Sequence, residues 1–178
     1  MGEDLSDVRA LIERIPLFAE VLDPGQIATL AAKATVYAVP PRTVLMSEGD
    51  YGDSMFAVID GAVEVTVEGA RSGSREVAML GPGDIVGEMS LMTGARRTAT
   101  VTSVVQTRVL QIRKAALEAV LAHSPDLVIG LGAMLARRQI ELERISEDEH
   151  AQRILGLRAS EIVAAIRRFF FPDQAERE

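Results

Sequence analysis

The sequence has no cysteine and only two histidines among its 178 residues. Without cysteine the chain can form neither a disulfide nor a thiolate metal site. The two histidines, His123 and His150, are 27 residues apart, so the cluster of imidazoles that would hold a catalytic metal ion is missing as well. We therefore expect no metal ion and no cofactor.

Long apolar runs are also missing. The longest nearly continuous one extends from Leu127 to Ala136, and it is shorter than the roughly 20 residues that a helix needs to span a bilayer. The N-terminus is acidic and charged, unlike a signal peptide. We expect a cytoplasmic location, either as a free protein or as the cytoplasmic domain of a membrane protein.

The chain also has fewer basic than acidic residues, 19 against 26, so its formal net charge is −7 at pH 7. A nucleic-acid-binding domain usually carries a basic surface. Only about 33 residues follow Ile145, too few for a helix-turn-helix domain after the last long helix that the sequence predicts. The sequence also lacks a nucleophile motif of a Ser-His-Asp hydrolase. We expect neither nucleic-acid binding nor catalysis.

The apolar residues, 48% of the composition, are enough for the core of one domain with flanking helices. Between residues 34 and 113, short apolar or β-branched segments are separated by glycine-rich turns. The segments are ATVYAV, RTVLM, MFAVI, AVEVTV, REVAML, TATVTSV and TRVLQI. This pattern predicts an antiparallel roll, either closed or made of two sheets. Asp60-Gly61 predicts a hairpin within it.

The segments on either side of the strands have helical spacing. Apolar residues recur at intervals of three and four from Leu5 to Ile15, and Asp23-Pro24 supplies the cap and first residue of a second helix. After the strands, residues 114–122 predict a short helix, and Ser124-Pro125 predicts the start of a longer one.

The longer helix carries an apolar seam that Arg138 interrupts. Beyond it, a last amphipathic stretch ends in three phenylalanines, residues 169–171, beside Arg167 and Arg168. Adjacent aromatic side chains are costly to leave in water. We expect them to pack on the chain's own roll or in a homodimer seam; contact with a partner or a membrane surface is the alternative.

The segment VGEMSLMTGARRTATV, residues 86–101, holds the candidate site. Gly87 allows a sharp turn or a close approach of the backbone to a ligand. Residues 88–92 are long enough for one helical turn, whose first amides favour an anion. Arg97 offers a bidentate fork to a phosphate or carboxylate, and the Glu88 carboxylate suits a pair of sugar hydroxyls. Taken singly, these residues also fit an ordinary ion pair and a plain turn.

The combination resembles a known family. GEMSLMTGARRTATV is similar to the phosphate-binding cassette of cyclic nucleotide-binding domains. That cassette has Gly-Glu, two positions, an aliphatic residue and a short turn, followed by an arginine, a small residue or threonine, an alanine and a small or polar residue. SEGDYGDSMFAVIDGAVEV and LGPGDIVGEM resemble that family's strands and turns, and IPLFAEVLDPGQIATLA resembles its N-terminal helical cap. The resemblance covers about residues 15–145.

The resemblance implies a mainly β fold with flanking helices: an antiparallel β jelly roll (double-stranded β-helix) with an N-terminal helical cap, a cassette helix and C-terminal lid helices. It divides the chain into a cap (1–33), a β-roll core (34–113), hinge and lid helices (114–146) and a C-terminal helical extension (147–178).

The resemblance also implies roles for particular residues. Arg97 would bind the cyclic phosphate and Glu88 the ribose 2′-hydroxyl. Thr98 is compatible with cAMP and with cGMP, whereas Arg96 is expected to be a solvated charge. The expected ligand-binding set is Gly87, Glu88, Met89, Ser90, Arg97, Thr98 and Ala99, with Val65, Val67 and Ala78 against the base and Arg138 and Leu142 as possible lid contacts.

These expectations describe a non-catalytic sensor of cAMP or cGMP that converts binding into movement of its C-terminal helices. The cap helices, LGPGDIVGEMSLMTG and the IRRFF tail look most like bacterial channel-associated members of the family, so we expect regulation of an ion channel. The alternative is a stand-alone regulator that acts on a partner protein. The expected partners are the cyclic nucleotide, an effector domain and a second copy bound through the C-terminal helices.

Overall fold

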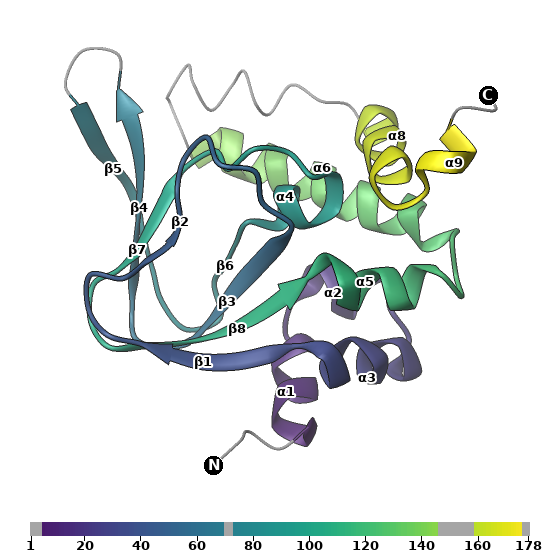
Figure 1. The fold of residues 1–178 in the computed structure, drawn as a ribbon, viewed down its shortest axis with the longest axis horizontal. Coiled ribbons are helices and arrows are strands. Elements are labelled where there is room, and N and C mark those ends of the chain that lie inside the picture. The colour runs from purple at the N-terminus through teal and green to yellow at the C-terminus, as the bar shows by residue number, and fades with distance from the viewer. Residues whose placement is uncertain (1–4, 70–72, 146–158, 176–178) are drawn as a thin grey trace.

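The computed structural model describes residues 5–69, 73–145 and 159–175. The strands within these ranges form two four-stranded sheets, and every strand pair is antiparallel (Figure 1). The first sheet has the order β1 (Thr35–Val39), β8 (Thr107–Arg113), β3 (Ser54–Asp60) and β6 (Ile85–Val86). The second has the order β2 (Val44–Met46), β7 (Thr100–Ser103), β4 (Val63–Gly69) and β5 (Gly73–Leu80). The antiparallel roll is confirmed, and of the two predicted forms it is the double-sheet one.

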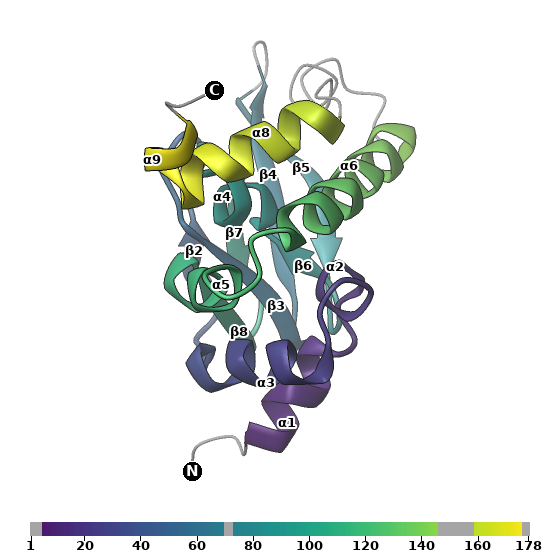
Figure 2. The same cartoon turned by 90° about the vertical axis from the view of Figure 1, so that its right-hand side faces the viewer.

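Helices gather at one side of the roll (Figures 1 and 2). Three precede the strands: α1 (Leu5–Ile12), α2 (Pro16–Ala19) and α3 (Pro24–Lys33). α4 (Glu88–Thr93) lies between β6 and β7. After the strands come α5 (Lys114–Leu121), α6 (Leu127–Ile145), α8 (Ala159–Phe170) and α9 (Pro172–Ala175).

The core has two parts that share strand β3. Phe56 and Val58 face the space between the sheets, whereas Met55 and Ala57 face the helices. Successive side chains of a strand point to opposite faces, so a strand covered on both sides must be apolar throughout. This explains why β3 is buried over five consecutive residues, 54–58.

The α3 helix begins with the predicted cap. The Asp23 side chain accepts a hydrogen bond from the Gln26 backbone N–H at 2.8 Å, and the Gln26 side chain accepts one from the Asp23 N–H at 2.9 Å. This reciprocal capping box supplies acceptors for N–H groups that have none within the helix.

We expect Asp23→Ala to lower the free energy of unfolding by about 1 kcal/mol, because an N-cap carboxylate is lost while its partner amide stays. Urea unfolding measures the change. Glu118→Ala, an exposed substitution on α5, should leave the unfolding midpoint unchanged and serves as the control. Equal midpoints for Asp23→Ala and the native protein would show that the cap does not contribute.

Two local predictions are corrected by the structure. Asp60-Gly61 forms no hairpin, because the strands on either side, β3 and β4, belong to different sheets. Gly61 does take the left-handed conformation, with φ of +95°, and it carries the chain from one sheet to the other. The long helix begins at Leu127 rather than at Pro125.

The phenylalanines near the C-terminus pack on the chain itself. On α8, Ile162, Ile166 and Phe170 are buried and Phe169 is half-buried in the core that the helices share. This is the expected packing within the chain, and it occurs chiefly against helices α4, α5 and α6 rather than against the open face of the roll.

Candidate functional site

The site is built around the short helix α4, which glycines delimit at both ends. Gly87 is its N-cap with φ of +83°, and Gly94 is its C-cap with φ of +70°. A Cβ on Gly87 would lie 2.6 Å from Arg97 Nη1 and 3.0 Å from the Ser54 carbonyl oxygen. Both the conformation and the space therefore require glycine at this position.

The Arg97 guanidinium is buried beside Gly87, with 7% of the residue exposed. Nη1 donates to the Ser54 carbonyl oxygen at 2.6 Å and to the Gly87 carbonyl oxygen at 3.4 Å, and Nη2 donates to Ser54 Oγ at 2.9 Å. A guanidinium has five N–H groups. Two of them, one on Nε and one on Nη2, have no acceptor in the part of the chain that the structure describes, so they can bind a ligand.

Burial lowers the pKa of Arg97 because removal from water disfavours the charged form, and the nearby Asp53 carboxylate opposes this effect. A cation that has lost hydration gains more from a bound anion than an exposed one does. The electrostatics of the site therefore favour a phosphate or carboxylate at the free N–H groups.

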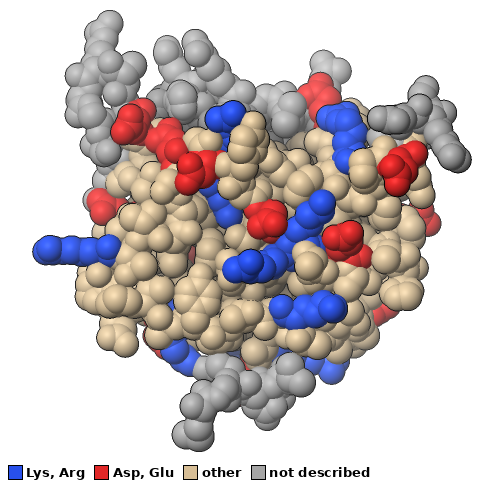
Figure 3. Space-filling model, in the orientation of Figure 1, with Lys and Arg blue, Asp and Glu red and all other residues tan. Residues whose placement is uncertain are grey.

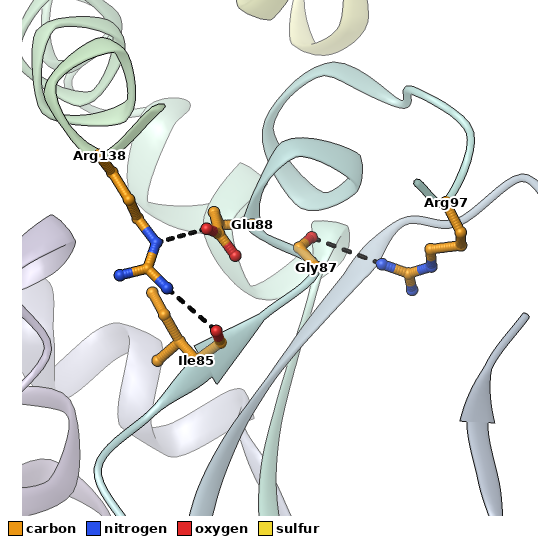
Figure 4. A network of polar contacts seen from close by, with 5 residues as sticks. All are labelled: Ile85, Gly87, Glu88, Arg97 and Arg138. Carbon is orange, nitrogen blue, oxygen red and sulfur yellow. Dashed lines mark hydrogen bonds and ion pairs between the residues drawn. The ribbon is translucent and has the colours of Figure 1, made fainter. Parts of the chain in front are cut away.

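Glu88, the first residue of α4, is only 8% exposed and is paired with Arg138 of α6. Arg138 Nε donates to Glu88 Oε1, and Arg138 Nη2 donates to the Ile85 carbonyl oxygen at 3.0 Å. Figure 4 shows Arg138 and Arg97 approaching the segment 85–88 from opposite sides. Glu88 Oε2 has no hydrogen-bond partner among the described residues, so it can accept a hydroxyl donor while Arg138 holds the other oxygen.

Sequence reasoning missed Gly52 and Ser54 on the loop and strand opposite α4. Ser54 orients Arg97 through two acceptors. A Cβ on Gly52 would lie 2.2 Å from Arg97 Nε and 2.4 Å from Cζ, so the backbone of residue 52 packs directly on the guanidinium. The signal was present in SEGDYGDSMF, which resembled the family, but which of its residues touch Arg97 depends on the pairing of distant segments.

The residues expected near the base lie on the second sheet. Val65 of β4 pairs with Ala78 of β5, so the two side chains share a face. Val63, two residues before Val65, is fully buried between the sheets, and Val65 packs against the same core. Val67 continues this face along β4. The inner face of the second sheet thus offers a half-buried apolar surface, and base contact there remains a prediction.

The other expected residues have varied surroundings. The Met89 side chain packs against the core that the helices share, and Ser90 Oγ donates to the Ala95 carbonyl oxygen at 2.8 Å. Thr98 is exposed and Ala99 is half-buried. Of the lid candidates, Arg138 is at Glu88, and the Leu142 side chain lies outside the described residues.

Arg96 contacts Tyr51, and its side chain shares none of the hydrogen-bond partners of the Arg97 side chain within the described ranges. Its guanidinium carbon lies 4.4 Å from the centre of the exposed Tyr51 ring, and Nη2 donates to the Tyr51 hydroxyl at 2.8 Å. Arg96 is exposed and holds the loop at Tyr51 beside the cassette, so only the second arginine of the pair faces the candidate site.

Comparisons with known proteins identify the family of the chain. The model of the cyclic nucleotide-binding domain matches residues 37–124. A crystal structure of a cyclic nucleotide-binding domain from Methylobacillus flagellatus superposes with a TM-score of 0.64 at 26% identity, over 87% of this chain and 86% of that one. The chain therefore belongs to the cyclic nucleotide-binding domain family.

Curated relatives have different effectors. The chain is 27% identical over 128 residues to a CRP-like cAMP-activated global transcriptional regulator of Mycobacterium tuberculosis, a match that covers 72% of this chain and 57% of the regulator. It is 30% identical over 117 residues to a cyclic nucleotide-gated potassium channel of Mesorhizobium japonicum, covering 66% of this chain and 31% of the channel. Thus the chain spans only part of each relative. No helix among residues 5–69, 73–145 and 159–175 is long and apolar enough to cross a membrane.

Proposed function

We propose that this chain is a non-catalytic sensor that binds a cyclic nucleotide between Arg97 and Glu88. The proposal rests on one observation: both side chains are buried, and each keeps hydrogen-bonding groups that no described residue occupies. Arg97 is a buried cation with two N–H groups still available, and Glu88, on the other side of Gly87, has one carboxylate oxygen available. A molecule with a phosphate joined to a sugar hydroxyl fits both groups at once.

In the proposed complex the cyclic phosphate binds the free N–H groups of Arg97 and the first amides of α4. The ribose 2′-hydroxyl donates to Glu88 Oε2, while Arg138 fixes the carboxylate through Oε1. The base lies against Val65 and Ala78. Because Arg138 donates through the edge of its guanidinium, the flat face stays available to stack on the purine.

The signal follows from the position of Arg138 on α6. A ligand shifts an equilibrium between two conformations only by as much as it prefers one of them. With the nucleotide bound, Arg138 contacts a carboxylate that the ribose also fixes, so α6 is better held over the cassette. Binding then favours the closed arrangement of the lid helix over open ones.

Calorimetric titration with cAMP and with cGMP tests the proposal. We expect saturable binding of one nucleotide per chain, with 5′-AMP as the control, because its open phosphate cannot present both groups in the same geometry. If the threonine hydroxyl binds the guanine, Thr98→Ala should lower the affinity for cGMP more than the affinity for cAMP. Failure of both cyclic nucleotides to bind would contradict the proposal.

For the effector we propose an ion channel, and a stand-alone regulator that acts on a partner protein is the alternative. The channel proposal is supported by the 30% identity to the Mesorhizobium japonicum channel. On the face shown in Figure 3, acidic side chains lie among and around the basic ones, which gives no support to a nucleic-acid partner. Hydrophobic spans encoded in the same gene would support the channel, and their absence from the gene would favour the free regulator.

A further inference from the structure

Helix α8 packs on two glycines: Gly94 at the end of α4, the cassette helix, and Gly132 on α6, the lid helix. A Cβ on Gly94, the C-cap of α4, would lie 2.5 Å from the Phe169 ring. A Cβ on Gly132 of α6 would lie 2.5 Å from Val163 Cγ2. Figure 2 shows α8 crossing the front of α4 and extending to α6. Side chains of α8 therefore occupy space that exists only because both positions are glycine.

A third contact comes from the hinge region. Lys114 Nζ, at the start of α5, lies 4.1 Å from the centre of the Phe169 ring and 5.6 Å from that of Phe170. The two rings meet edge to face, with 5.2 Å between their centres. An ammonium over an aromatic face is attractive, so Lys114 adds to the docking of this end of α8.

Helix α8 contacts α4 and α6, which are also the two helices that the Glu88–Arg138 ion pair connects. Glu88 begins α4 and Gly94 ends it, whereas Arg138 and Gly132 lie on α6, nearly two turns apart. α8 and the ion pair thus hold the cassette helix and the lid helix together at separate places. The match to the family model ends at residue 124, so α8 lies outside the matched segment.

We propose that α8 is a strap whose docking is coupled to nucleotide binding at the site proposed above. Docked α8 keeps α6 on α4, which keeps Arg138 on Glu88 and leaves Glu88 Oε2 and two N–H groups of Arg97 ready for the ligand. No protein contact has to break for the ligand to bind. Because such coupling is reciprocal, bound nucleotide must strengthen the docking of α8 by the same factor. Release of α8 is then easier in the empty protein than in the complex, and this difference is the signal that an effector can read.

Two glycine substitutions on α6 distinguish an effect on the docking of α8 from an effect on α6 itself. Gly132→Ala places a methyl group against Val163 of α8, whereas Gly130→Ala, less than one turn away, meets Val21 of the N-terminal segment at 3.0 Å. Both changes favour the helical conformation of α6 to a similar degree. In titrations of the folded proteins we expect Gly132→Ala to lower cAMP affinity about 5- to 10-fold and Gly130→Ala to change it less than about 2-fold.

Two further changes act on the other contacts of α8. Phe169→Ala removes the ring from Gly94, and Lys114→Gln removes the charge from the ring but keeps the length of the side chain. We expect a loss of affinity of about 5-fold for Phe169→Ala and about 2-fold for Lys114→Gln. Arg168→Ala, an exposed substitution on the same helix, should bind as the native protein does.

Hydrogen exchange of the unmodified chain gives the reciprocal measurement. We expect saturating cAMP to slow exchange of the α8 amides, residues 159–170, as well as those of the cassette. If cAMP binds in an Arg97-dependent way but α8 exchange is unchanged or faster, or if Gly132→Ala and Gly130→Ala bind equally well, the strap is disproved and the binding site stands. If the unmodified chain binds no cyclic nucleotide, both proposals fail.

Discussion

Replacing Arg97 with alanine is expected to weaken cyclic nucleotide binding at least about 30-fold, a loss of at least about 2 kcal/mol. Two features make the effect large. The guanidinium is buried, which removes the water that would otherwise screen its charge, and its two free N–H groups are charged donors that a phosphate can reach. An alanine leaves the phosphate in a partly desolvated place with no cation beside it.

The same substitution should cost stability. The Ser54 carbonyl and hydroxyl oxygens lose the donors that hold them, and the buried carbonyl then has to find water or stay unpaired. We expect the free energy of unfolding to fall by about 1 to 3 kcal/mol. Binding is therefore measured by calorimetry at a temperature well below the unfolding midpoint of the variant.

Two variants separate charge, geometry and position. Arg97→Lys keeps the charge but loses the planar fork, so an intermediate loss of affinity is expected. Arg96→Ala removes the neighbouring exposed arginine, which stacks on Tyr51, and should leave affinity unchanged. Equal losses for Arg96→Ala and Arg97→Ala, or undiminished binding by Arg97→Ala, would mean that the phosphate site has been assigned to the wrong residue.

The second large effect is expected from Gly52→Ala. Its Cβ would lie within 2.7 Å of Nε, Cζ and Nη2 of Arg97, and the tip of a side chain moves more readily than the backbone that frames it. We expect the guanidinium to be displaced from Ser54 and Gly87 while the fold persists. Affinity for cAMP should fall at least about 10-fold, which corresponds to about 1.4 kcal/mol.

Gly81→Ala is the matched control, because a Cβ there has nothing within 4 Å and its backbone is not left-handed. Circular dichroism and urea unfolding report whether each variant folds, and calorimetry reports binding. Native affinity in folded Gly52→Ala would show that Arg97 does not need the position in which the structure holds it.

The part of the site that could be predicted from the sequence is contiguous. Gly87, Glu88 and Arg97 lie within one short segment, and the conformation of that segment depends on local rules: a left-handed glycine, one helical turn and a second left-handed glycine. The apolar alternation of β4 likewise indicated that Val65 and Val67 share a face, and the pairing with Ala78 is consistent with this.

The remainder depended on contacts between distant segments. Ser54 and Arg97 are 43 positions apart, and Arg138 and Glu88 are 50 apart. A charge within an apolar seam indicated that Arg138 was unusual, but the pattern could not say which group it meets. The hairpin predicted at Asp60-Gly61 was wrong for the same reason. The positive φ of Gly61 is a local property, whereas the partner of each strand depends on the packing of the whole roll.

The central claim is that Glu88 and Arg97 bind the sugar and the phosphate of one ligand, and a thermodynamic cycle tests it most directly. Calorimetry compares cAMP with 2′-deoxy-cAMP on the unmodified chain, on Glu88→Gln and on Arg97→Ala. We predict that loss of the 2′-hydroxyl weakens binding to the unmodified chain about 10-fold, weakens binding to Glu88→Gln by less than about 3-fold, and keeps its full effect on Arg97→Ala wherever binding is measurable. A 2′-deoxy penalty of the same size in Glu88→Gln as in the unmodified chain would contradict the account.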